Sequence, residues 1–76
     1  AEGTAEALEF TVHEDHGTLT GVPLRDLKTR EGVILCAILR RGKVIIPGGS
    51  DTIEQGDHVV IATTIKQLTD LSMILK

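Results

Sequence analysis

Apolar and polar side chains alternate near the start of the chain, and this alternation indicates a β-strand with one buried face. Within residues 7–14, Leu8, Phe10 and Val12 fall on one side of an extended backbone, while the residues between them are polar. Residues 15–21 are then rich in Gly, Thr and Asp, which favour turns. A strand followed by a loop is therefore expected.

The middle of the chain predicts a short helix and a β-hairpin. Residues 22–32 favour a helix, because Pro23 suits a first helical turn and apolar side chains three apart follow it. Residues 33–40 form a continuous apolar run, typical of a central strand with both faces covered. Arg41–Gly42 provides a two-residue loop, residues 43–47 return antiparallel, and Pro47 ends this strand because it lacks an N–H.

The last third predicts an irregular connection, a fourth strand and a closing helix. Ile53 anchors residues 48–57, which turn at Gln55–Gly56, and residues 58–64 favour a strand. Thr64 and Gln67 match a helix capping box. Apolar side chains then recur at helical spacing, at Ile65, Leu68, Leu71 and Leu75. The order β-α-β-β-β-α predicts an α+β fold, a small domain with a four-stranded, mainly antiparallel sheet.

Length and composition limit the chain to one small domain. A chain of 76 residues buries only roughly 60% of its unfolded surface. Phe10 is the only aromatic residue, so the core must consist of Val, Ile and Leu. We expect residues 1–7 to be a linker or disordered start and residues 8–76 to form the domain. Because no Met opens the chain, we expect a piece of a longer protein, and a core this thin favours burial against a second copy.

Charge and cysteine content exclude several functional classes. A net charge of −3 argues against nucleic-acid binding, which usually needs a basic surface, and the lack of aromatics removes a stacking platform for bases. No apolar run approaches the length of a membrane span, and no signal peptide is recognisable. The single Cys36 cannot form an internal disulfide, and its apolar surroundings predict a buried, reduced thiol in a cytosolic protein.

Two stretches have residues that could hold a ligand. Residues 13–16, with two imidazoles and two carboxylates, could supply part of a metal shell, but solvated side chains at a strand end are the favoured interpretation, and no metal site is predicted. Residues 47–51 could present backbone N–H groups to a phosphate, yet no helix is expected to begin there and the full glycine fingerprint is missing. A connection with unusual backbone angles is the better explanation for these glycines.

The cationic side chains fall in two groups, one at the predicted hairpin and one on the predicted short helix: Arg40, Arg41 and Lys43, and Arg25, Lys28 and Arg30. Arginine grips phosphate or carboxylate with two donors, but cations beside a hairpin are more often solubilising. The ligand interpretation requires a second copy that brings two groups together.

Catalytic chemistry is not indicated. No Ser, Thr or Asp stands at a recognisable nucleophile–base spacing from a His, and Glu54 and Asp57 flank a turn that is expected to be exposed. We therefore expect no catalytic residue and no enzymatic activity.

Three motifs together resemble the C-terminal regulatory domain of the TrkA type, also called the RCK C-terminal domain. They are a G-x-P-L-x-D-L helix, an apolar strand ending I-x-R-x-G, and a P-x-x-x-D-x-I-x-x-G-D-x-V segment. The matching residues are Gly21, Pro23, Leu24, Asp26 and Leu27, then Ile38, Arg40 and Gly42, then Pro47, Asp51, Ile53, Gly56, Asp57 and Val59. The resemblance covers roughly Leu8 to Leu75, nearly the whole chain.

The resemblance implies a cytoplasmic regulatory module of bacterial or archaeal potassium uptake systems, potassium channels and other transporters. Such a module is peripheral to the inner membrane through its partner, a membrane-embedded cation transporter or channel subunit. It typically forms a homodimer, and in some members a small anionic nucleotide such as cyclic di-AMP binds at the dimer interface. NAD or ATP would bind a separate Rossmann domain, so no cofactor is expected in this domain.

The ligand-binding residues suggested by the resemblance and by the basic groups are Leu24, Arg30, Ile34, Pro47, Arg40 and Arg41. Ile34 stands where some nucleotide-binding members have a polar residue, and an apolar side chain there leaves a base edge without a hydrogen-bond partner. The favoured hypothesis is a ligand-sensing, dimerising domain that controls potassium transport. The alternative is a purely structural assembly module of a transporter or exchanger, with no ligand of its own.

Overall fold

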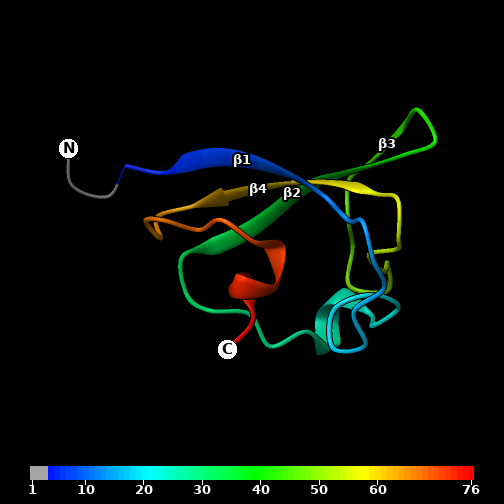
Figure 1. The fold of residues 1–76 in the computed structure, drawn as a ribbon, viewed down its shortest axis with the longest axis horizontal. Coiled ribbons are helices and arrows are strands. Elements are labelled where there is room, and N and C mark those ends of the chain that lie inside the picture. The colour runs from blue at the N-terminus through cyan, green and yellow to red at the C-terminus, as the bar shows by residue number, and fades with distance from the viewer. Residues whose placement is uncertain (1–3) are drawn as a thin grey trace.

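One four-stranded sheet forms the framework of the protein, as the computed structural model, which describes residues 4–76, shows (Figure 1). Every neighbouring pair of strands is antiparallel, and the order across the sheet is β1-β4-β2-β3. The strands are β1 (Glu6–Thr11), β2 (Val33–Arg40), β3 (Lys43–Ile45) and β4 (His58–Thr63). The predicted four-stranded antiparallel sheet is confirmed. β1 begins inside the predicted linker 1–7, of which residues 1–3 lie outside the described residues.

The β2–β3 hairpin has the predicted two-residue loop. Arg40 pairs with Lys43, which leaves Arg41 and Gly42 to turn the chain. Their φ angles are +52° and +76°, and positive values at both positions are those of a type I′ turn. Gly42 adopts this conformation without steric cost, which explains the R-G sequence at the tip.

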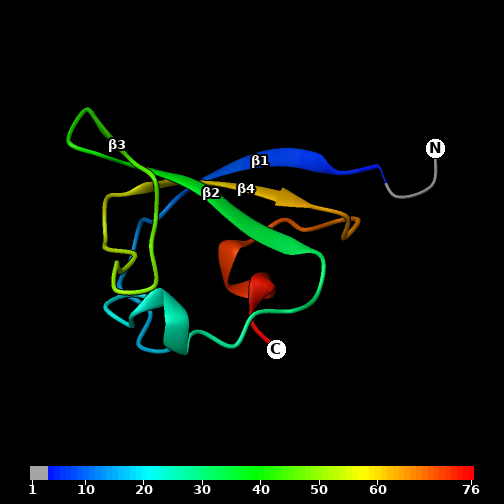
Figure 2. The same ribbon diagram turned by 180° about the vertical axis from the view of Figure 1, so that it is seen from behind.

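The core lies between the sheet and two 3-10 helices, η1 (Leu24–Asp26) and η2 (Leu71–Ile74), both on the same side of the sheet (Figures 1 and 2). Ile38, Val59 and Ile61 contribute the inner face of the sheet and are fully buried. Phe10 pairs with Val59 and Leu8 with Ile61, so the predicted alternation in β1 is confirmed. Ile53 and Ile74 close the core from outside the sheet and are also fully buried.

The prediction that β2 is covered on both faces is wrong, and so is the prediction of a buried Cys36. Ile34 is 66% exposed, and Cys36 is exposed as well. The register shifts between Leu35 and Ala37, so Cys36 is the extra residue of a β-bulge. Because both 3-10 helices lie on one side of the sheet, its other side stays open (Figure 1). We call that side the outer face.

The two predicted α-helices are absent from the described residues, and one 3-10 turn takes the place of each. The first ends after Asp26, because Leu27 is extended and Thr29 forms a β-bridge with Leu75. At the C-terminus the predicted capping box fails, since the φ of Gln67 is +62°, outside the helical region. Asp70 caps η2 instead by accepting a hydrogen bond from the Ser72 N–H at 2.9 Å.

The C-terminal segment nevertheless buries its apolar side chains. Leu68 and Leu71 belong to the core, and Ile65 and Leu75 pack against it. Thr and Asp side chains bond to nearby backbone, as when Thr63 Oγ1 accepts from the Ile65 N–H, and such bonds compete with a helix. The longest helical stretch among residues 4–76 is η2, far too short to cross a bilayer.

Candidate functional site

An apolar patch covers part of the outer face of the sheet. Side chains alternate along a strand, so the neighbours of buried inner-face residues point outward. Ile34 on β2 and Val44 on β3 are each 66% exposed, and Ile46, directly after β3, is 77% exposed. Among residues 4–76, Met73 is the only other exposed large hydrophobic side chain. We call Ile34, Val44 and Ile46 the outer patch.

The outer face becomes polar toward β1. His58 Nδ1 lies 3.3 Å from Glu9 Oε2 and 3.1 Å from Thr11 Oγ1. These side chains come from paired positions of β1 and β4, since Thr11 is opposite His58. The outer patch is therefore an apolar area with a polar border, which is the composition of a protein interface and its rim.

The first half of β2 also has a free edge. β3 pairs only with Ile38–Arg40, whereas β4 pairs along Val33–Leu39. Within residues 4–76, Val33–Ala37 thus have a strand neighbour on one side alone. Figure 2 shows the molecule from the side of β2, with the chain after β3 turning down from the sheet toward η1.

The structure brings the segments of Leu24 and Pro47 together. The Leu24 N–H donates to the Asp51 carbonyl at 2.9 Å, and the Arg25 N–H donates to the Gly49 carbonyl at 3.0 Å. A Cβ on Gly49 would lie 3.2 Å from the Arg25 Cβ, a tight contact that glycine avoids. η1 is thereby fixed against the turn that follows Pro47.

The glycine-rich segment after Pro47 is not an open phosphate cradle. The Gly48 N–H donates to Asp51 Oδ2 at 2.7 Å, so a carboxylate of the same turn occupies the position that an anion would take. Neither Gly48 nor Gly49 has a positive φ. The prediction of unusual backbone angles here is wrong, and the close contact with η1 explains the second glycine instead.

Arg30 lies just before β2 and is held by the C-terminal segment, whereas Ile34 is exposed on the outer face. The Arg30 N–H donates to the Ile74 carbonyl at 2.8 Å, and its Nη1 donates to the Met73 carbonyl at 3.2 Å. The remaining guanidinium donors bond to no residue among 4–76. No hydrogen bond in the described part of the chain joins this pair to Leu24 or Pro47.

Arg40 belongs to the framework of the sheet. Its Nε and Nη2 donate to the two carboxylate oxygens of Asp57, both at 2.8 Å, and Nη2 also donates to the Thr52 carbonyl at 2.8 Å. Asp57 is only 1% exposed and also accepts from the Glu54 N–H. The turn at Gln55–Gly56 is exposed, as expected, but the Asp57 side chain that flanks it is buried. Burial raises the pKa of Asp57, but the hydrogen bonds from Arg40 and the Glu54 N–H outweigh it and hold that pKa below its usual value.

Arg41 lies at the hairpin tip, remote from the other predicted ligand residues. It is seven positions along a nearly extended chain from Ile34, a span of about 23 Å. Within one copy, Arg41 and Ile34 therefore cannot hold the same small ligand.

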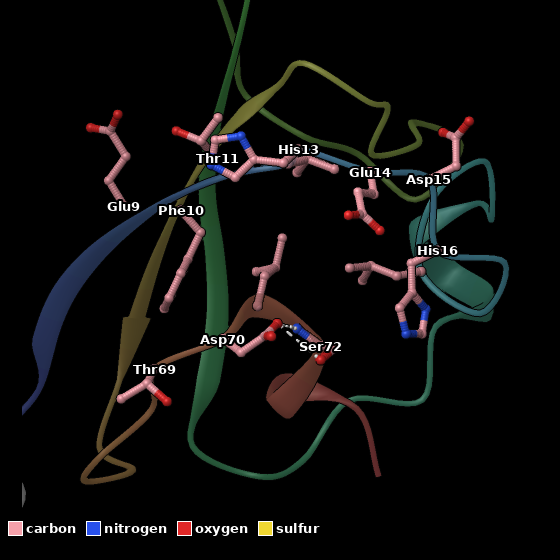
Figure 3. Close-up of a pocket in the computed structure, with 13 residues that line it drawn as sticks. Glu9, Phe10, Thr11, His13, Glu14, Asp15, His16, Thr69, Asp70 and Ser72 are labelled. Atoms are coloured by element: carbon pink, nitrogen blue, oxygen red, sulfur yellow. Dashed lines mark hydrogen bonds between the residues drawn. The ribbon is translucent and has the colours of Figure 1, made fainter.

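A cleft of about 550 Å³ opens beside β1, between the end of that strand and the turn before η2 (Figure 3). Phe10, Val12, Leu19 and Leu71 supply its apolar lining. The predicted 13–16 stretch lines the rim with Asp70. We call this the β1 cleft. No group of three or more metal-ligating side chains among residues 4–76 is placed to hold a metal ion.

Sequence reasoning missed the β1 cleft and the extent of the outer patch. The apolar spacing of residues 65–75 predicts a helix through Asp70 and Ser72, and this pattern gives no sign that they lie opposite residues 13–16. The outer patch did have a signal, because Val44 and Ile46 alternate with Ile45, which is partly buried and packs against the core.

The TrkA-C domain family matches residues 7–76. The Trk system potassium uptake protein trkA homolog 1 of Methanosarcina mazei is 32% identical over 74 residues, which are 97% of this chain and 18% of that protein. The Trk system potassium uptake protein TrkA of Haemophilus influenzae is 37% identical over 67 residues, 86% of this chain and 15% of that protein. The chain thus spans less than a fifth of the length of these curated relatives.

A solved structure described as "Structure of RCK domain with cda" has the same fold. It covers 80% of this chain and 83% of its own, with a TM-score of 0.66 and 21% sequence identity. The family match and this fold agree with the motifs found in the sequence.

Proposed function

The chain belongs to the TrkA-C domain family, and we propose that it is the cytoplasmic regulatory domain of a potassium transport protein, pairing with a second copy through the outer patch. The relatives named above are potassium uptake proteins, and a membrane transporter is the partner that their names imply. The proposal adds two elements, a homodimer and a ligand at its interface.

The outer patch is the observation that supports the homodimer. Ile34, Val44 and Ile46 are 66–77% exposed on the outer face, while the free edge of β2 lies beside Ile34. A small domain with an aliphatic core gains stability when such a surface is removed from water. In a two-fold dimer the same patch on both copies is buried at once.

The ligand proposed for this interface is a small anionic nucleotide. Arg30 supplies guanidinium donors that are free within the described chain, and Ile34, Leu24 and Pro47 offer apolar contacts for bases. A two-fold axis would place a second set of the same residues around the interface. The ligand would shift the transporter only through its difference in affinity between two arrangements of the copies.

The second candidate is an assembly module without a ligand, and one observation favours it. Arg40 donates to Asp57 and Thr52, and Arg30 already donates to Met73, so two of the predicted ligand-binding arginines have protein partners. In this case the homodimer is the whole function of the domain.

The homodimer is tested by sedimentation velocity of the wild-type chain and of Ile34→Glu. The variant should remain folded, because Ile34 is largely exposed, and should sediment as a monomer where the wild type dimerises. Met73→Glu is the matched control, since Met73 is exposed but lies outside the outer patch. A wild type that is monomeric at about 1 mM would remove the homodimer, because functional homodimers of this size normally form at lower concentrations.

The ligand is tested by calorimetric titration with cyclic dinucleotides and mononucleotides. A saturable heat that Arg30→Ala abolishes and Arg41→Ala leaves unchanged supports the sensing function. A stable dimer without heat from any of these nucleotides favours the assembly module.

A further inference from the structure

We propose that the β1 cleft of one copy binds the β2–β3 hairpin tip of another copy, with Lys43 and Arg41 entering between Glu14 and Asp70. This contact uses the hairpin tip, which borders the outer patch at Val44, and it does not depend on the proposed function.

The β1 cleft has the charge for a basic occupant. None of its thirteen lining residues is Lys or Arg, whereas four are carboxylates. Figure 3 shows the Glu14 carboxylate turned into the cleft and the Asp70 carboxylate on the opposite wall beside Ser72. Asp70 Oδ1 accepts from both the N–H and the hydroxyl of Ser72, while Oδ2 accepts no hydrogen bond from residues 4–76. A cation between these walls would meet a carboxylate on each side.

The β1 cleft also has the backbone and the apolar lining for an extended segment. β1 pairs only with β4 among the described strands, so its other edge is free beside the cleft. Phe10 and Leu71 offer apolar surface between the charged walls. An extended strand could pair with the free edge of β1 through its backbone. Its alternating basic and apolar side chains would then fill the cleft.

The hairpin of the same chain has these features. Arg41 and Lys43 are exposed at its tip, and Val44 follows them. β3 is the opposite edge of the sheet from β1, so the hairpin cannot reach the cleft of its own copy (Figure 1). β3 runs antiparallel to β1 within the sheet order, and strand directions would keep alternating across the contact between copies.

The charges select this pairing over others. Basic residues on one edge and acidic residues near the other discourage each edge from pairing with its own kind, yet they leave the mixed pairing favourable. Because two different surfaces meet, the contact is head to tail and leads to rings or open chains of copies rather than to a closed dimer.

Charge reversal in the cleft and at the hairpin tip tests the contact. The variants are made in an Ile34→Glu background, which prevents association through the outer patch. Self-association is measured by sedimentation at about 0.05 M and about 0.5 M NaCl, since salt screens exposed charges. Glu14→Lys and Lys43→Glu should each weaken association about tenfold. An equimolar mixture of the two variants should associate like the parent, because each hairpin then meets a cleft of opposite charge.

Matched controls are Glu31→Lys and Lys66→Glu, which make the same charge changes at exposed positions outside the cleft and the hairpin. Circular dichroism checks that every variant is folded. The proposal is overturned by any of three results: a parent without salt-sensitive association, a mixture that stays dissociated, or controls that weaken association as much as the test variants.

Discussion

The two free edges of the sheet differ in chemistry although both belong to one four-stranded sheet. On the side of β2 and β3 the exposed large hydrophobic side chains are Ile34, Val44 and Ile46. Beside β1 the cleft is rimmed by carboxylates and imidazoles. An apolar surface suits a permanent partner that removes it from water, whereas a charged cleft suits a reversible partner sensitive to salt.

The difference follows from where the 3-10 helices lie. Both cover the inner face, so nothing in residues 4–76 shields the outer patch, while the turn before η2 forms the second wall of the β1 cleft. A helix packed on the outer face would have buried the outer patch and left the β1 cleft unchanged. The residues that stabilise the fold can be distinguished by mutation from those of the outer patch and the β1 cleft.

The largest contrast is expected between an isoleucine of the core and one of the outer patch. Ile53→Ala should cost about 3–4 kcal/mol, because Ile53 is fully buried and its loss leaves a cavity. Ile46→Ala should cost at most about 0.5 kcal/mol in the monomer. A stability of roughly 4–11 kcal/mol is usual for 76 residues, so the first change can nearly unfold the domain. Urea denaturation measures both, and equal costs would contradict the assignment of Ile46 to the outer face.

A smaller loss is expected when the ion pair between Arg40 and Asp57 is broken. Arg40→Met leaves the buried Asp57 carboxylate without both hydrogen bonds from the guanidinium, which should cost about 3 kcal/mol. The Asp57 carbonyl accepts from the Val12 N–H, so the end of β1 should loosen together with β2. Amide hydrogen exchange of Val12 and Leu39 would report both effects. Lys43→Met, on the adjacent strand, is the control that removes a cation without breaking the pair.

Acid should weaken the fold through the same carboxylate. The pKa of folded Asp57 lies below the ordinary value of 3.8. Its contribution is therefore fully present above the unfolded value and is lost as the pH falls through the lower folded value. Stability measured from pH 6 downward should decrease below about pH 4 in the wild type. The Arg40→Met variant should lose less stability over the same pH range. An equal loss would show that other carboxylates determine the acid sensitivity of the fold.

The sheet could be predicted from the sequence because its signals are local. The alternation in β1, the R-G turn and the isolated Ile53 each constrain a few neighbouring residues, and the structure confirms all three. The C-terminal helix was predicted wrongly for the opposite reason. Its apolar spacing is satisfied by core packing around η2, while Gln67 leaves the helical region and Asp70 provides the cap.

The candidate site was less predictable, because its features depend on contacts between distant residues. The apolar run 33–40 has the same sequence pattern whether one face or two are covered, so the exposure of Ile34 and Cys36 required the positions of η1 and η2. Adjacency in the sequence groups Arg40 with Arg41 as a basic cluster, yet the partner of Arg40 is Asp57, which lies 17 positions away in the chain. The acidic rim of the β1 cleft combines residues 13–16 with Asp70, which no local pattern connects.

The central claim, that a second copy covers the outer patch, is tested most directly by the alkylation rate of Cys36. This thiol is exposed on the bulge of β2, two residues from Ile34, and is the only cysteine of the chain. The rate should fall as the wild-type protein is concentrated through its dimerisation range and should stay constant for Ile34→Glu. A wild-type rate that does not change with protein concentration would contradict the claim.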